Sequence, residues 1–139
     1  MKLHPSTLRL SVLMPALMCS TVLHAQNLND AIAADYNKNL KGLFEHLHQN
    51  PELSFMEFNT SKRLADELAA LGYEVTPGVG KTGVVAILKN GKGPMVMMRA
   101  DMDALPVEEK SGLPYASKTK SKDWFGKEVS VMHACGHDM

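Results

Sequence analysis

The sequence has 139 residues, enough for about one domain. Its 15 Lys and Arg residues balance its 15 Asp and Glu residues, which argues against a basic nucleic-acid-binding surface and against an acidic disordered tail. The hydrophobic fraction of 45% is ordinary for a globular protein and gives no sign of a collagen-like, disordered or disulfide-rich chain.

The first 25 residues have the layout of a secretory signal peptide. Lys2 and Arg9 give a positive start, a largely apolar run from residue 10 to residue 23 follows, and Ala25 provides the small residue of a cleavage site. The run is shorter than the roughly 20 apolar residues of a membrane span, so an uncleaved anchor is the less favoured alternative. We therefore expect export to the periplasm or the medium, with residues 26–139 as the mature chain and no stable membrane insertion.

Two helices are predicted at the start of the mature chain. The first covers Asp30–Leu47, where apolar residues recur at helical spacing, and Asn50-Pro51 ends it. The second begins at a capping box formed by Ser54 and Glu57, and Gly72 provides its left-handed stop. The expected buried stripe of the second helix contains Phe58, Leu64, Ala65, Leu68 and Leu71.

The pattern changes to strands after residue 72. Short strands are predicted at Tyr73–Thr76, Val84–Leu88, Met95–Met98 and Val129–Met132, and Lys110–Lys127 is predicted to be a solvated loop or hairpin. The second and third of these strands are continuous apolar runs, which are typical of strands covered on both faces. The sequence therefore predicts an α/β fold.

The end of the sequence holds four residues that can bind a metal within six positions, in the run HACGHD. Thiolate and imidazole suit zinc and its neighbours, whereas magnesium and calcium prefer oxygen ligands. Gly136 lets the backbone turn so that Cys135 and His137 face one ion, and His133 or Asp138 could orient a ligand from outside the coordination sphere. The alternative is a buried thiol flanked by two polar histidines, which costs free energy when such groups lack partners.

Cleavage of the signal peptide would leave Cys135 as the one cysteine of the mature chain, so an intramolecular disulfide is excluded there. A lone thiol in an exported protein is a liability unless something occupies it. Metal coordination is one such occupation.

A second polar cluster, Asp101 and Asp103, follows the apolar run Met95–Met98. Residues two apart on a strand point the same way, and open α/β sheets place their sites at the carboxyl ends of strands. Two like charges repel unless a cation or an arginine compensates them, and a metal centre would do so. The alternative is a strand end whose carboxylates face water.

Three stretches together resemble the peptidase M20 family, and within it the aminoacylase and hippurate-hydrolase-like amidohydrolases. They are LHQNPELSF at 47–55, RADMDALP at 99–106 and MHACGHDM at 132–139. The resemblance implies an M20-type zinc-peptidase catalytic domain with a central mixed sheet and flanking helices. It also implies a substrate class, N-acyl amino acids or related small amides, and two divalent metal ions, commonly zinc, manganese, nickel or cobalt.

Carried over by position, Cys135 and His137 match the first two metal ligands of the family, and Asp103 matches the acidic residue that supports the metal site. Asp101 stands where many relatives outside this branch have a metal-binding histidine, so its role stays open. His133 and Asp138 are candidates for the surroundings of the ligands.

In the family, the chain continues past the Cys-Gly-His-Asp motif with a Glu pair, further histidine ligands and a smaller α/β domain that often makes the dimer. One member of the Glu pair is the general base. We therefore expect residues 26–139 to be the N-terminal portion of the catalytic domain, inactive by itself. The full-length form is expected to be a homodimer or a higher oligomer, acting on a small peptide-like substrate and not on nucleic acid.

Two other functions stay open at this point. Cys135 could be a nucleophile activated by His133 or His137, which would make a cysteine hydrolase. The chain could also be a non-catalytic exported metal-binding module. The spacing of His46, His48 and Glu52 assigns no role to these residues, and ordinary solvation of a polar helix end is the favoured interpretation.

Overall fold

The computed structural model describes residues 27–136, so the predicted signal peptide lies outside the described residues, as do His137 and Asp138. A long helix comes first, in three sections: α1 (Leu28–Asp35), the π-helical η1 (Tyr36–Leu40) and α2 (Lys41–Gln49). Asn50 caps its end, and the Asn50 side-chain amide donates to the His46 carbonyl at 2.7 Å. The first predicted helix and its stop before Pro51 are confirmed.

Helix α3 (Phe58–Ala70) begins in a different way from the predicted capping box. A turn in which the Met56 N–H donates to the Leu53 carbonyl separates Ser54 from the helix, so Ser54 cannot cap it. The carboxylate of Glu52 takes this role instead and accepts from the backbone N–H groups of Asn59 and Thr60, at 3.2 and 2.7 Å.

The predicted stripe of α3 is correct in the middle of the helix and wrong at both ends. Leu64, Ala65 and Leu68 are half-buried, whereas Phe58 is 58% exposed and Leu71 is 72% exposed. Gly72 has a φ of 87°, a left-handed conformation that glycine adopts without steric cost. The predicted helix stop is therefore confirmed.

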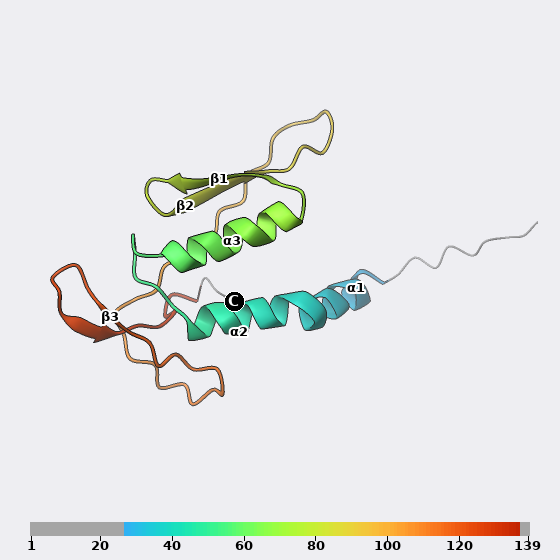
Figure 1. The fold of residues 1–139 in the computed structure, drawn as a ribbon. Coiled ribbons are helices and arrows are strands. Elements are labelled where there is room, and N and C mark those ends of the chain that lie inside the picture. Colours follow the sequence, from blue (N-terminus) through green and yellow to red (C-terminus); the bar gives the residue numbers. More distant parts are fainter. Residues whose placement is uncertain (1–26, 137–139) are drawn as a thin grey trace, which may run out of the picture.

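In the described part of the chain, four short strands form two antiparallel hairpins, β1 (Glu74–Val79) with β2 (Gly83–Ile87) and β3 (Lys120–Lys122) with β4 (Glu128–Ser130). In Figure 1, α3 lies between the β1–β2 hairpin and the long helix that ends with α2, and the β3–β4 hairpin lies at one end of the molecule. Strand β3 lies at the end of the lysine-rich segment Lys110–Lys127, and its partner β4 overlaps the predicted strand Val129–Met132, so this segment forms a hairpin with the strand that follows it.

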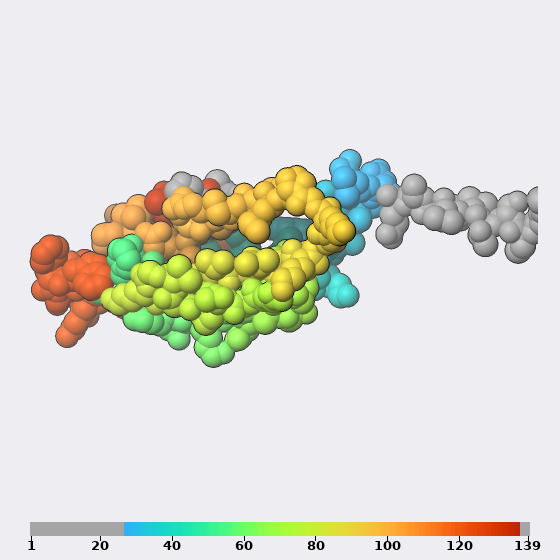
Figure 2. Space-filling model, turned by 90° about the horizontal axis from the view of Figure 1, so that it is seen from above, coloured from blue at the N-terminus to red at the C-terminus, as the bar shows by residue number. Residues whose placement is uncertain are grey.

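The predicted strand Met95–Met98 is wrong for the described residues. This segment has no strand partner, and its four side chains are 84 to 94% exposed. Figure 2 shows the segment before Asp101, coloured yellow to orange, arching along the outside of the molecule. Strand β2 is also open on one side, with Val85 and Ile87 each 45% exposed, so the expected cover on both faces is missing from the described part.

The small core lies where three segments meet. Leu53 pairs in parallel with Ala104, and Leu105 pairs antiparallel with Met132, as isolated bridges. Leu53, Ala104 and Val131 are 5, 2 and 1% exposed, so each segment contributes one buried side chain. The parallel and antiparallel pairings share one central segment, which agrees with the predicted α/β class and its mixed sheet.

Within residues 27–136, no helix has both the length and the apolar character needed to cross a bilayer.

Candidate metal centre

The bridge between Leu105 and Met132 brings the two predicted site motifs side by side. The Leu105 N–H donates to the Met132 carbonyl at 3.0 Å, and the Met132 N–H donates back to the Leu105 carbonyl at 3.1 Å. Asp103 lies two residues before this bridge, and Ala134, between His133 and Cys135, lies two residues after it. The bridge therefore holds the segment that carries Asp101 and Asp103 beside the segment that leads into His133 and Cys135.

Cys135 is outside any disulfide and is exposed, while His133 is half-buried. Gly136 has a φ of 75°, so the backbone turns there in the conformation expected of a flexible glycine. Among residues 27–136, no three His, Cys, Asp or Glu side chains lie close enough to hold a metal ion. The exposed thiol of Cys135 is still of the type that binds a thiophilic metal such as zinc, and zinc commonly takes imidazole ligands together with thiolates.

The two predicted carboxylates do not simply face water, as a solvated strand end would. Asp101 forms an ion pair with Arg99, and its side chain is 23% exposed. Asp103 is half-buried. An arginine thus supplies part of the charge compensation that two neighbouring carboxylates need.

A buried polar pair near the motif was missed by sequence reasoning. The Nε2 atom of His48 lies 3.0 Å from the Oε1 atom of Glu109, and the two side chains are 10 and 1% exposed. Ordinary solvation of His48 is therefore a wrong expectation. The residues are 61 positions apart, so no local spacing could have paired them.

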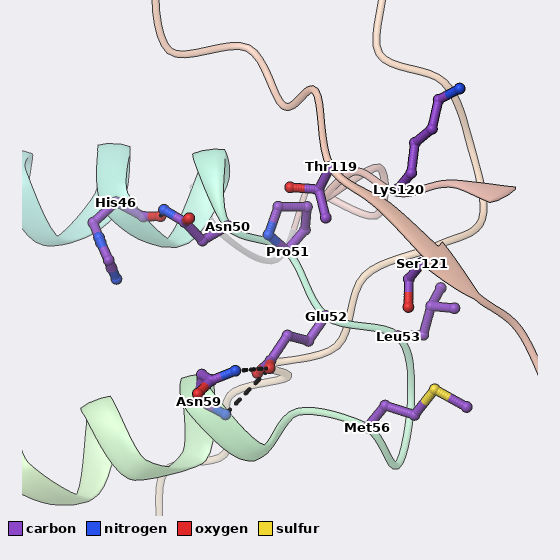
Figure 3. Close-up of a pocket in the computed structure, with 10 residues that line it drawn as sticks. All are labelled: His46, Asn50, Pro51, Glu52, Leu53, Met56, Asn59, Thr119, Lys120 and Ser121. Atoms are coloured by element: carbon purple, nitrogen blue, oxygen red, sulfur yellow. Dashed lines mark hydrogen bonds between the residues drawn. The ribbon is translucent and has the colours of Figure 1, made fainter. Parts of the chain in front are cut away.

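One hollow on the described surface lies away from the motif residues. It measures about 390 Å³ and sits between the end of α2, the turn before α3 and strand β3 (Figure 3). Glu52 lines it, but both Glu52 oxygens already accept hydrogen bonds from the start of α3. None of Asp101, Asp103, His133 or Cys135 lines this hollow, so the chemistry of the motifs does not point to it.

Comparison with known proteins supports the three-motif resemblance. No family model matches the sequence. N-acetyl-L-cysteine deacetylase of Bacillus subtilis strain 168 is 49% identical over 102 residues, which cover 73% of this chain and 22% of that relative. Hippurate hydrolase of Campylobacter jejuni is 48% identical over 104 residues, which cover 71% of this chain and 25% of that relative.

A solved structure agrees in fold as well as in sequence. It is a Bacillus subtilis protein described as a dinuclear metal binding peptidase from the M20 family, with a TM-score of 0.62 and 38% identity, over 76% of this chain and 28% of that chain. The chain belongs to the M20 family. It spans about a quarter of the length of the curated relatives that it matches.

Within this M20 chain, the environment of Glu109 lowers the pKa of its side chain. Burial raises the pKa of the carboxyl, but hydrogen bonds from Ser111, His48 and the Ser117 N–H outweigh burial, and the pKa lies below its ordinary value of 4.5. The folded protein therefore favours the carboxylate form.

The pKa shift predicts a pH dependence of stability. Because folding lowers the pKa of Glu109, its contribution is fully present above pH 4.5 and is lost as the pH falls through the lower, folded value. Urea unfolding at neutral pH and at several values below 4.5 should show a stability gap between the wild type and Glu109→Gln that narrows as the pH falls. A gap that widens below 4.5 would contradict the lowered pKa.

Proposed function

We propose that the protein is part of a metal-dependent hydrolase that cleaves the amide bond of N-acyl amino acids or related small amides. The observation that carries this proposal is the pairing of Leu105 with Met132, which unites the two motif segments in a chain similar to a dinuclear metal binding peptidase. Two relatives, at 49 and 48% identity, are named as a deacetylase of N-acetyl-L-cysteine and a hydrolase of hippurate. Both names describe small amide substrates.

In this proposal Cys135 and His137 are metal ligands, and Cys135 is not a nucleophile. The turn at Gly136 separates the two donors by one residue, and the exposure of Cys135 leaves its sulfur accessible to an ion. Asp103 supports the site from the paired segment. When bound, two divalent ions, drawn from zinc, manganese, nickel and cobalt, supply Lewis acidity toward the amide carbonyl and the attacking water.

The number of protein ligands in the motif is lower than a catalytic metal site usually has. Catalytic zinc sites usually have three protein ligands, and the motif offers Cys135 and His137. We therefore expect the 139 residues by themselves to hydrolyse no N-acyl amino acid. Assembly into a homodimer or a higher oligomer belongs to the same proposal for the whole enzyme.

Metal removal tests the reaction class. In the intact protein, EDTA should abolish hydrolysis of N-acyl amino acids, and added zinc or manganese should restore it, because the ions supply the Lewis acid. Cys135→Ala should lower the bound metal and the activity together, as measured by elemental analysis and by amine release. Cys19→Ala is the matched control, since Cys19 lies in the segment assigned to the signal peptide.

The opposite pattern would identify the rival mechanism. Activity that survives EDTA and is destroyed by iodoacetamide would assign Cys135 as a nucleophile instead of a ligand. Stoichiometric metal binding without hydrolysis of any amide would identify a non-catalytic metal-binding module.

Export through residues 1–25 is a further part of the proposal, and it rests on the positive start, the apolar run and Ala25. N-terminal sequencing of the protein recovered from the periplasm or the medium should begin at Gln26. Recovery of a chain that retains Met1 in the cytoplasm would contradict it.

A further inference from the structure

The ring of His48, on helix α2, lies beside His133, the first residue of the HACGHD run, which we call the metal loop. Its centroid lies 6.4 Å from that of His133, with the two planes tilted by 36°. Tyr115 meets the same ring edge-on at 5.5 Å, and Phe44 lies at 5.8 Å, one helical turn away on α2. The ring is therefore held on several sides, and one of its neighbours is the first residue of the motif.

Glu109 connects the same ring to the backbone that leads into the loop. Its Oε1 atom pairs with His48 at 3.0 Å, and its Oε2 atom accepts from the Ser117 N–H at 2.5 Å. The Ser117 hydroxyl then donates to the Val131 carbonyl at 2.7 Å. The buried carboxylate of Glu109 thus contacts the His48 ring beside His133 directly. Through Ser117 it is also linked to the carbonyl of Val131, two residues before His133.

We propose that His48 and Glu109 form a positioning pair that fixes the start of the metal loop and thereby raises the affinity of the Cys135 site for its ion. This inference rests on the proposed function, since it assumes that Cys135 binds a metal. Neither residue is proposed to touch the ion or the substrate. The pair acts through His133 and through the Val131 carbonyl.

The physical basis is preorganisation. Groups that orient ligands without binding the metal themselves commonly change metal affinity by about 10- to 100-fold when they are replaced. A buried carboxylate that accepts several hydrogen bonds has few alternative conformations, so it can hold the loop backbone before the ion arrives. A purely structural pair would stabilise the fold but would leave the affinity of a correctly folded protein unchanged.

A metal titration with a matched control tests the proposal. Zinc alone is titrated into the intact protein in competition with a chromophoric chelator, for the wild type, Glu109→Gln and Glu57→Gln. Glu57 is the matched control, because it is 6% exposed and accepts from the Thr82 hydroxyl at 2.6 Å, in a contact between the start of α3 and the β1–β2 turn. The unfolding free energy of each metal-free protein is measured in parallel.

The expected result is a zinc affinity about 10- to 100-fold weaker in Glu109→Gln and unchanged in Glu57→Gln. Ser117→Ala removes the hydrogen bond to the Val131 carbonyl, together with the bond that the Ser117 hydroxyl accepts from the Thr119 N–H. It should weaken zinc binding as well, and it replaces Glu109→Gln if that variant does not fold. Equal affinity in the wild type and in every folded variant of the pair or of Ser117 would overturn the positioning role alone. Absence of zinc binding by the wild type, or binding unchanged in Cys135→Ala, would overturn the proposed function and with it this inference.

Discussion

Backbone pairing at Ala104 and Leu105 is the constraint on which the rest of the structure depends. The Ala104 N–H donates to the Glu52 carbonyl at 2.8 Å, and Leu105 exchanges two hydrogen bonds with Met132. These contacts join parts of the chain that are about 50 and about 30 residues apart, and they coincide with the most buried apolar side chains of the described residues. Without this pairing, the segment that carries Asp101 and Asp103 would lose the backbone contact that holds it beside the segment that carries Cys135.

The residues around the proposed site differ in their exposure to solvent. The side chains of His48 and Glu109 are buried, whereas Cys135 is exposed. This division suits a metal centre, because the groups that orient ligands must be held still while the donors remain accessible.

Sequence reasoning succeeded where structure is local. Apolar spacing predicted the long first helix, and Gly72 predicted the end of α3, because periodicity and a left-handed stop depend on neighbouring residues. It failed where partners are distant. Met95–Met98 has the composition of a strand but no neighbour in the described chain, and Glu52 replaces the predicted Ser54 cap from outside the helix. The pairing of His48 with Glu109 left no trace in the local sequence. The HACGHD run and the two aspartates, by contrast, were recognised from their residue types and spacing, and the family resemblance then suggested their roles.

Hydrogen exchange of the metal-free protein tests most directly whether the pairing exists before any ion binds. The amides of Ala104, Leu105 and Met132 should exchange far more slowly than an unstructured peptide, because each donates a backbone hydrogen bond beside the buried core. The exposed amides of Met95–Met98 provide the fast reference within the same chain. If all of these amides exchanged at the unstructured rate until zinc was added, the scaffold would be a product of metal binding and not its cause.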